Sequence, residues 1–521
     1  MRRRRVTILD LVTKSPTSSA WQRVMSPNFA SIMPQVLGVW CEELGHDVRF
    51  VCYTGNENLE DELAADTDVL FIGAFTHAAQ LAYAISALFR SRGVVTVLGG
   101  PHARSYPEDA SKYFDYVLGM TTKTIVDDVL RDAEPQAGLG QRFAAERQPL
   151  QLPGVRERWK FIEPTLAKAP WIKIVPMISS LGCPYTCSFC VDSTVDFQPL
   201  DANQIRDDLR FLLGKMKRPI VGWHDPNFGM RFEETMGAIE EAVPRNRIEF
   251  AAESSLSLLT EPRLARLQKN GFKAILPGIE SWFTCGNKSK TGQAVGLEKV
   301  KRVSEHVNTI LRYIPYVQTN FVPGLDEDQG REPFELTKRF LDLTPGAFPA
   351  YSLLSSFGRS APLDLLLQTA NRVLPVPFHF LNNNRATNVR PKNYSLPDLY
   401  DHVIDLRRYS FSWRAIGRRL HANRVSTAGG LNLVRAMSSE GFGRIRYDVS
   451  VRRLLGSDTS VRAYFEGENR TLPGFFREQV RSDLGFLWNW LPEGALSHDE
   501  NAYREERKNE GPLYTLEPAV T

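Results

Sequence analysis

Three cysteines stand close together in the middle of the chain: Cys183, Cys187 and Cys190, separated by three and then by two residues. When the loop wraps around a cubane, thiolates at this spacing can bind three irons of one iron–sulfur cluster. A structural zinc site normally needs four ligands, and no fourth Cys or His lies at short spacing here. Three ligands leave one iron open to a substrate or a cofactor. The pattern therefore predicts a catalytic cluster.

The other three cysteines, Cys41, Cys52 and Cys285, lie in apolar or irregular contexts, and we expect them to be packed core residues. The basic run Arg2–Arg5 precedes a segment that is too short and too charged for a signal-peptide core. Nowhere do 18 apolar residues follow one another, so no membrane span is expected. We therefore expect a protein of the reducing cytoplasm.

A second candidate site is the segment Leu98-Gly99-Gly100-Pro101-His102. Paired glycines allow a bulky ligand or its phosphate to approach the backbone closely, and Pro101 stops a strand from continuing. The alternative is a purely structural turn. Two interpretations are also open for His102: it contacts the ligand, or it is a histidine on the surface.

The elements that would position these residues begin with an α/β unit over residues 1–132. Apolar, β-rich runs predict strands at Arg5–Val12, Asp47–Tyr53, Val69–Phe75, Val94–Leu98 and Tyr116–Leu118. Amphipathic stretches between and after them predict helices at Ala30–Leu44, Ala78–Arg92 and Thr122–Arg131. This alternation is typical of a doubly wound, Rossmann-like parallel sheet, whose ligands bind beyond the carboxyl ends of the strands.

The alternation resumes over residues 171–350, after a polar stretch at 133–170 that we interpret as a linker. Strands are predicted at Ile174–Ser180, Ile220–Trp223, Ile248–Ala252, Ala274–Pro277 and Tyr313–Phe321. Helices are predicted at Ala202–Met216, Phe232–Ala242, Glu261–Lys269, Leu297–Val307 and Phe334–Leu343. Five or six units are fewer than the eight of a complete TIM barrel, so we predict an open or partial barrel with its site at the carboxyl ends of the strands.

The last part, residues 351–521, is less regular and is expected to be mostly helical and to recognise the substrate. Its basic stretch Arg407–Arg424 is either a solvated helix face or a site for an acidic substrate group. With 521 residues the chain is too long for one core. Its 64 Lys and Arg against 60 Asp and Glu show no basic stripe beyond these short runs, so we expect no nucleic-acid partner.

The cysteine loop, with Phe189 inside it and a barrel strand before it, resembles the radical S-adenosylmethionine (SAM) superfamily. The resemblance implies a 4Fe–4S cluster on Cys183, Cys187 and Cys190, with SAM chelating the open iron. An electron from the cluster, supplied by a donor such as flavodoxin or ferredoxin, would cleave SAM to a 5′-deoxyadenosyl radical.

Residues of about 5–350 are also similar to the cobalamin-dependent branch of that superfamily. The resemblance rests on the Gly99-Gly100-Pro101 turn in its sheet, on His224-Asp225-Pro226-Asn227-Phe228, on the run from Lys269 to Ser281, and on Phe321-Val322-Pro323-Gly324-Leu325. Two features depart from the branch. Gly119-Met120-Thr121-Thr122 replaces a Gly-Glu-Gly-Glu turn, and no Asp-x-His-x-x-Gly motif offers a histidine to cobalt.

The resemblance implies two groups of cofactor contacts. The cobalamin contacts would be Thr76, Gly99, Gly100, Pro101, His102 and Gly119, and the SAM contacts would be Phe189, Asp225, Glu253, Glu280 and Ser281. Plain structural roles stay open for several of them. Thr76, Glu253, Glu280 and Ser281 can each cap a helix instead of contacting a cofactor. Asp225 can form a turn at the end of a strand.

The function implied is methylation of an unactivated carbon or phosphinate centre in a small-molecule or natural-product substrate. The first alternative is a cobalamin-dependent radical cyclase or rearrangement enzyme that transfers no methyl group. The second is a cobalamin- or cluster-binding sensor without turnover.

Overall fold

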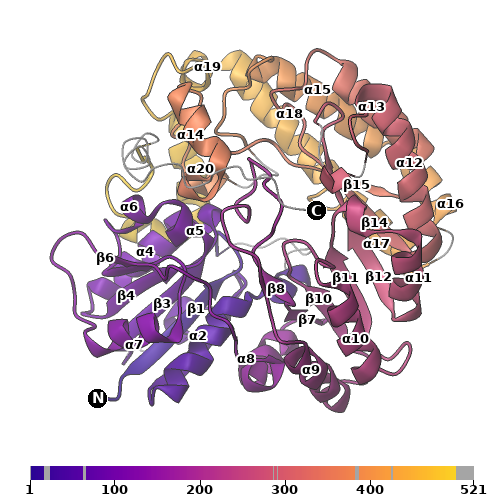
Figure 1. The fold of residues 1–521 in the computed structure, drawn as a ribbon. Coiled ribbons are helices and arrows are strands. Elements are labelled where there is room, and N and C mark those ends of the chain that lie inside the picture. Colours follow the sequence, from indigo (N-terminus) through magenta and orange to yellow (C-terminus); the bar gives the residue numbers. More distant parts are fainter. Residues whose placement is uncertain are drawn as a thin grey trace.

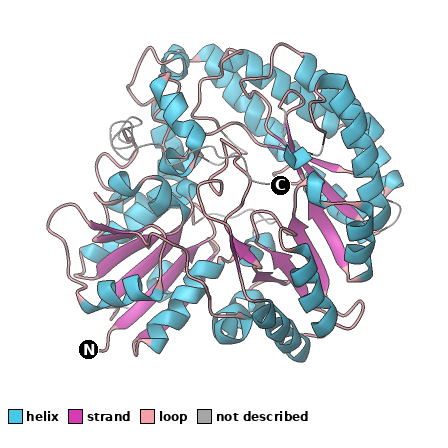
Figure 2. Cartoon of the chain, viewed as in Figure 1, coloured by secondary structure: helices cyan, strands magenta, loops and turns pink. Residues whose placement is uncertain are grey.

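The computed structural model describes residues 2–16, 24–62, 66–284, 287–289, 291–381, 386–423 and 426–499. Two parallel sheets lie side by side, and a layer of C-terminal helices lies across them, at the top of Figure 1. Strands are confined to the first two parts of the chain apart from one isolated bridge between Val373 and Val389, as Figure 2 also shows for the described residues. The predicted fold class is therefore confirmed.

The N-terminal sheet has the strand order β2-β1-β3-β4-β5-β6, with all pairs parallel. Its strands are β1 (Arg5–Leu11), β2 (Asp47–Tyr53), β3 (Val69–Ala74), β4 (Val95–Gly99), β5 (Tyr116–Leu118) and β6 (Gln141–Phe143). The helices and turns of this part are η1 (Ser26–Phe29), α2 (Ile32–Glu43), α3 (Leu59–Glu62), η2 (Thr76–Ala78), α4 (Ala79–Arg90), α5 (Pro101–Ser105), α6 (Pro107–Ala110) and α7 (Lys123–Arg131).

Strand β1 shows why this sheet needs helices on both faces. All its residues after Arg5 are buried, as expected for a strand that is covered on two sides. Val6 and Ile8 pack with α2 and α7 in one apolar cluster, while Leu9 and Leu11 pack with α4 in another. The continuous apolar run in the sequence therefore has a direct structural cause.

The stretch at 133–170, interpreted above as a linker, carries two regular elements. Strand β6 pairs with β5 as the sixth strand, and helix α8 (Val155–Ala167) packs against α2 and α9 (Ala202–Lys215). Strand β6 has three partly or fully exposed residues, too few to show a period, and Pro164 interrupts the pattern of α8. The domain boundaries themselves stay a prediction.

The second sheet is a partial barrel of parallel strands in the order β7-β10-β11-β12-β14-β15, with β13 beside β14 after β12. Its strands are β7 (Ile174–Met177), β10 (Ile220–Trp223), β11 (Glu249–Glu253), β12 (Phe272–Leu276), β13 (Gly278–Glu280), β14 (Tyr316–Phe321) and β15 (Phe348–Tyr351). A short hairpin, β8 (Ser180–Leu181) with β9 (Gln198–Pro199), follows β7. The helices and turns are α9 (Ala202–Lys215), α10 (Phe232–Ala242), η3 (Leu256–Leu258), α11 (Glu261–Lys269), η4 (Asn287–Ser289), α12 (Gly296–Tyr313) and α13 (Glu332–Leu343).

The register of this sheet separates its two faces. Val221 is level with Phe250, and Trp223 is level with Ala252. All four are buried, and the Trp223 ring packs against the rings of Phe228 and Phe250. Gly222, Ala251 and Ala274 form a level row on the opposite, inner face. Ala251 and Ala274 are partly exposed, so their small side chains leave room inside the partial barrel, whereas the Ile174 side chain of β7 packs beside Gly222.

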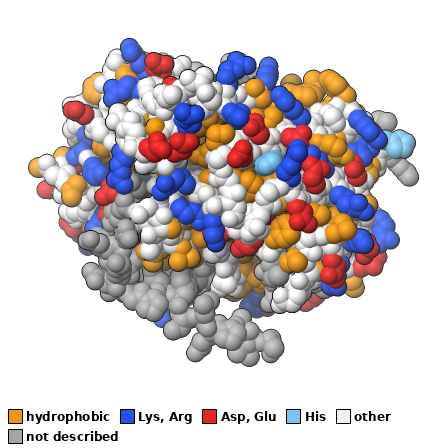
Figure 3. Space-filling view, turned by 90° about the horizontal axis from the view of Figure 1, so that it is seen from above, with side chains coloured by type: hydrophobic (Ala, Val, Ile, Leu, Met, Phe, Trp, Pro, Cys, Tyr) orange, Lys and Arg blue, Asp and Glu red, His pale blue; other side chains and the backbone are white. Residues whose placement is uncertain are grey.

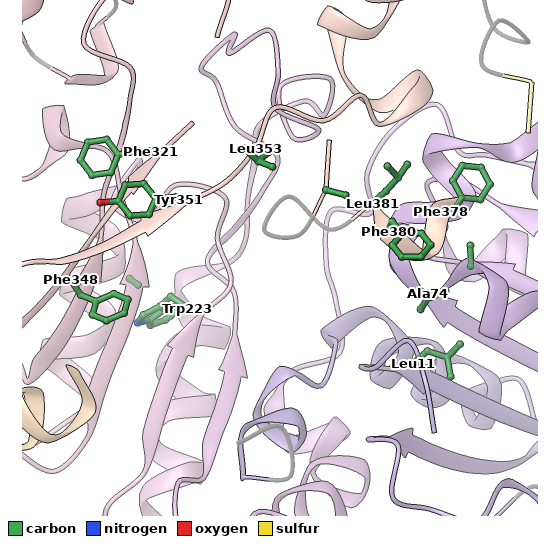
Figure 4. Close-up of a cluster of buried hydrophobic side chains, with 14 of the residues drawn as sticks. Leu11, Ala74, Trp223, Phe321, Phe348, Tyr351, Leu353, Phe378, Phe380 and Leu381 are labelled. Carbon is green, nitrogen blue, oxygen red and sulfur yellow. The ribbon is translucent and has the colours of Figure 1, made fainter. Parts of the chain in front are cut away.

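The C-terminal part is helical, as predicted, and it closes over the N-terminal sheet. Its elements are η5 (Gly358–Ser360), α14 (Pro362–Thr369), η6 (Phe378–Phe380), α15 (Leu396–Ser410), α16 (Trp413–Ala422), α17 (Thr427–Met437), α18 (Phe442–Ser457), α19 (Thr459–Glu466), α20 (Gly474–Leu484) and η7 (Gly485–Trp490). Figure 4 shows Phe378, Phe380 and Leu381 beside Leu11 and Ala74, at the ends of β1 and β3. The C-terminal part therefore covers the carboxyl ends of β1 and β3.

The surface and the basic stretch give two further observations. On the described part of the face in Figure 3, basic and acidic side chains are interspersed. In the basic stretch, Arg407 is buried against Asp448 at 3.1 Å, and Arg419 is buried and donates to the Ser410 carbonyl. These two arginines are therefore neither solvated nor open to a substrate. Among the described residues, no helix has the length and apolar character needed to cross a membrane.

Candidate functional site

The three cysteines lie in the loop between β8 and β9, after the first strand of the partial barrel. Gly182 begins the loop with a φ of +66°, and a side chain there would collide with the carbonyl oxygens of Val195 and Asp196. The Cys190 amide donates to the Cys187 carbonyl at 3.0 Å, which forms a tight turn between the last two cysteines. All three cysteines are partly exposed and form no disulfide.

The thiols share one electrostatic environment with Lys288, a residue that the sequence analysis did not single out. Burial raises the pKa of Cys183 and Cys187, and that of Cys190 to about 11, and the charge of Lys288 opposes the rise in each case. Burial also disfavours the charged ammonium of Lys288, but the attraction of Glu280 and of the thiolates outweighs it and raises its pKa. Lys288 Nζ lies 3.1 Å from Glu280 Oε1. No sequence pattern marks this lysine.

The donor set fits an iron–sulfur cluster better than a single metal ion. Among the described residues, no three Cys, His, Asp or Glu side chains come together closely enough to hold one ion. A cubane does not need such convergence, because each thiolate binds a different iron. The thiols of Cys183 and Cys190 are nevertheless close enough to that of Cys187 for its charge to affect their ionisation. Cys41 and Cys52 are fully buried core residues, as predicted, and Cys285 lies outside the described residues.

Asp225 holds the start of the cysteine loop from the next strand. It is buried, and its carboxylate accepts hydrogen bonds from the Ser179 amide at 3.1 Å, the Ser179 hydroxyl at 2.5 Å and the Ser180 hydroxyl at 2.9 Å. Asn227, also buried, accepts from the Ser255 amide at 2.8 Å. Asp225 therefore positions the start of the cysteine loop, and its predicted contact with SAM stays a prediction.

Glu253 ends β11 on the inner face, where it is solvent-exposed. The surrounding protein still raises its pKa by desolvation, and Asp192 and Glu280 add to the rise while Lys288 opposes it. Glu253 is therefore open to solvent and at the same time surrounded by protein, as in a concave part of the surface. Ser255 and Thr260, and not Glu253, precede the following helices, so the capping alternative is wrong.

Glu280 and Ser281 follow one another but serve different partners. Glu280 has a φ of +67°, a rare conformation for a residue other than glycine, and its carboxylate pairs with Lys288 beside the thiols. Ser281 is buried and donates to Asp328 Oδ1 at 2.6 Å, which ties β13 to the turn after β14. Phe189 packs against a small apolar cluster that includes Leu325 and Val389. Apart from Phe189, which belongs to the loop, Glu280 and Glu253 are the predicted SAM contacts that share the charged surroundings of the cysteines.

The glycine turn of the N-terminal sheet borders open space, as its predicted use requires. Gly99 ends β4, and a side chain there would meet no atom within 4 Å. Gly100 has a φ of +90°, and both it and Pro101 are exposed. Gly119, after β5, is partly exposed and donates its amide to the Phe143 carbonyl at 2.8 Å. Gly99 therefore leaves room for a bulky ligand at the part of the edge that η6 does not fill, whereas Ala144 limits the space beside Gly119.

Thr76 and His102, in contrast, are buried. Thr76 is buried in η2. His102 is fully buried, its Nε2 lies 2.6 Å from the Tyr83 hydroxyl, and its ring packs edge-on against Phe378. Burial lowers its pKa to about 3. His102 is therefore neither a surface histidine nor a residue that a ligand can reach at this edge.

The glycine turn and the cysteine loop lie next to each other. Arg104, in the helix that starts at Pro101, donates to the Val191 carbonyl just after Cys190. Ser105 also bonds Ser360 at 2.9 Å, and Ser360 accepts from Thr194 of the same loop at 3.0 Å. The edge of the first sheet therefore faces the cysteine loop of the partial barrel.

Comparison with known proteins gives three informative matches, although no family model matches the chain. Bacteriochlorophyllide d C-12(1)-methyltransferase of Chlorobaculum tepidum is 24% identical over 312 residues, covering 57% of this chain and 67% of the relative. Bacteriochlorophyllide d C-8(2)-methyltransferase of the same organism is 27% identical over 245 residues, covering 43% of this chain and 53% of the relative. The chain thus matches only about half the length of the second relative.

The third match is a solved structure, the radical SAM methyltransferase TsrM from Kitasatospora setae with cobalamin and a 4Fe–4S cluster bound. It has a TM-score of 0.51 and 14% identity, and the match covers 71% of this chain and 75% of TsrM. The chain has the fold of a cobalamin-dependent radical SAM methyltransferase. The predicted resemblance is therefore confirmed, and both relatives are named as methyltransferases, the class of enzyme that the sequence predicts.

Proposed function

We propose that this protein is a cobalamin-dependent radical SAM methyltransferase that methylates an unactivated carbon of a small-molecule substrate. The observation that carries the proposal is the position of the three-cysteine loop at the mouth of the partial barrel, beside the open glycine turn of the first sheet. In this arrangement a substrate in the barrel mouth would lie between two cofactors. The named relatives, which are carbon methyltransferases, support the same reaction.

The residues that would hold the cofactors follow from the site. Cys183, Cys187 and Cys190 would bind the cluster, and Glu253 and Glu280 would contact SAM. When bound, the cluster supplies the electron that cleaves SAM, and cobalamin supplies the transferred methyl group. The chain itself binds and orients these groups and keeps water away from the radical. Asp225 fixes the start of the cysteine loop by accepting hydrogen bonds from Ser179 and Ser180.

Glycine makes room for cobalamin at the sheet edge. The open space at Gly99 and the exposed Gly100-Pro101 turn would accept the corrin or its nucleotide tail. The absence of an Asp-x-His-x-x-Gly motif from the sequence leaves cobalt without a histidine from that motif. Cobalamin bound here should therefore give the absorption spectrum of a form without a nitrogen ligand from the protein.

Anaerobic reconstitution followed by product analysis tests the proposal. Bacteriochlorophyllide d is the first substrate to assay, because both curated relatives act on it. Formation of 5′-deoxyadenosine together with S-adenosylhomocysteine and a methylated product would support methyl transfer. Formation of 5′-deoxyadenosine alone would indicate the cyclase alternative, and neither product would indicate the sensor.

The variant Cys187→Ala tests the cluster assignment directly. We expect it to lose most of its iron and all of its SAM cleavage, since two thiolates hold a cubane poorly. Cys41→Ala, which changes a buried cysteine far from the loop in sequence, is the matched control and should retain both. If Cys187→Ala kept its iron and its SAM cleavage, the assignment would be wrong.

A further inference from the structure

His224 is a histidine for which the functions described so far give no role. It directly follows β10, and its amide donates to the Met177 carbonyl of β7 at 2.8 Å. Side chains alternate along a strand, so His224 lies on the same face as Gly222, and Trp223 lies on the other. Gly222 is level with Ala251 in the row of small residues. The imidazole therefore projects from the inner face of the partial barrel.

Its neighbour in sequence, Asp225, is buried and accepts hydrogen bonds from Ser179 and Ser180. The His224 ring, in contrast, is solvent-exposed and makes no hydrogen bond or ion pair with any residue that the structure describes. Gly222, which has no side-chain carbon, lies beside the ring: a Cβ added there would be 3.8 Å from His224 Cδ2 and Nε2, and 2.9 Å from Cγ2 of Ile174 on its other neighbour β7. An unpartnered polar group thus faces the room left by the small residues.

The surroundings keep this imidazole uncharged. Desolvation by the surrounding protein lowers the pKa of His224 to about 4, and the positive charge of Arg158 on α8 contributes to the shift. Arg158 is the only charged group of the described residues to act on it in this way, and no carboxylate offsets the shift. A neutral imidazole offers one N–H donor and one acceptor nitrogen. It can therefore donate a hydrogen bond to an uncharged polar group of a substrate or accept one from it.

We propose that His224 contacts the substrate: it lies in the space between the two cofactors and hydrogen-bonds a carbonyl, hydroxyl or carboxyl group that orients the methylated carbon. The inference rests on the proposed function, because that function places a substrate in the barrel mouth. It assigns a specificity-determining residue to the carboxyl end of β10, directly before Asp225, which fixes the cysteine loop. The three cysteines, Glu253 and Glu280 remain with the cofactors.

Footprinting with diethyl pyrocarbonate tests this placement without turnover. The reagent modifies accessible, neutral imidazoles, and peptide mass spectrometry locates the product. We expect His224 to react in the protein without cofactors and to react still in the reconstituted holoenzyme loaded with cobalamin and SAM. Exposed His421 should react in both states and buried His102 in neither, which gives a control for each extreme. The variant His224→Gln verifies the assignment of the modified peptide.

The pH dependence of the same reaction tests the environment. Between pH 7 and pH 5 the reactivity of His224 should fall by less than about twofold, whereas free N-acetylhistidine, with an ordinary pKa, should lose about 95% of its reactivity. Protection by SAM or by cobalamin would overturn the inference, since His224 would then belong to a cofactor site. Absence of modification in the unloaded protein would overturn it as well. A failed methylation assay would instead count against the proposed function, so the two failures are distinguishable.

Discussion

Lys288 shows how one side chain can set the charge balance of the site. Its ammonium pairs with Glu280 and acts on all three cysteines, whose thiolates add negative charge to a cluster. Lys288→Met should therefore weaken cluster retention, on the order of the tenfold effects seen when groups around a metal centre are removed. Iron and sulfide analysis after reconstitution and desalting measures this. Lys288→Arg keeps the charge and should retain the cluster; equal loss in both variants would show that charge is not the cause.

Asp328 makes a pH-dependent contribution to stability at the residue scale. Burial raises its pKa to about 6, although Ser281 and the Gly324 amide donate hydrogen bonds to it. A carboxyl group whose pKa is higher in the folded than in the unfolded state stabilises the fold most below about pH 4, and this stabilisation is lost as the pH rises through about 6.

The variant Asp328→Asn removes that titration. We expect the difference in unfolding free energy, wild type minus variant, to fall by about 2 kcal/mol between pH 4 and pH 7. Urea denaturation of the protein without cofactors, at half-unit pH intervals, gives this difference. A difference that does not change with pH would mean that Asp328 titrates normally in the folded protein.

At the scale of elements, the cysteine loop depends on the backbone of Gly182. Its left-handed conformation and the nearby carbonyls of Val195 and Asp196 exclude a side chain. Gly182→Ala should cost about 2 kcal/mol of backbone strain and displace the loop, so that less iron is bound after reconstitution. Gly214→Ala is the matched control, because a side chain there meets nothing within 4 Å in helix α9. Normal iron content in Gly182→Ala would contradict this view of the loop.

The elements also show what the sequence could and could not predict. Several elements match the predicted bounds, because an apolar run or an amphipathic pattern marks each of them in the sequence. Examples are strands Asp47–Tyr53 and Ile220–Trp223 and helix Phe232–Ala242. Strand β6 was not predicted, since its three residues are mostly exposed and gain their order only by pairing with β5. The cysteine spacing predicted the loop correctly. Lys288 and the orientation of His102 depend on contacts between distant segments, which no local pattern contains.

At the scale of the whole molecule, helix α8 joins the two sheets. Buried Arg158 donates to Gln35 of the N-terminal part at 2.7 Å, to the Pro153 carbonyl before α8 at 3.1 Å, and to the Pro176 carbonyl of β7 at 3.5 Å. Burial lowers its pKa to about 10, which leaves it charged at neutral pH. A single cation therefore ties together the part with the glycine turn and the part with the cysteine loop. The proposed reaction requires these two sites to keep a fixed separation.

Arg158→Met should weaken this connection more than it weakens either sheet. The substitution keeps most of the apolar volume but leaves Gln35 Oε1 and two carbonyls without their donor, which should cost about 3 kcal/mol. We expect faster proteolysis between residues 133 and 170 and a lower unfolding midpoint. The double variant Gln35→Met with Arg158→Met removes the stranded amide as well and should recover part of the loss, because the two residues interact directly. Strictly additive effects would show that Arg158 acts through its own packing and not as a link between the two sheets.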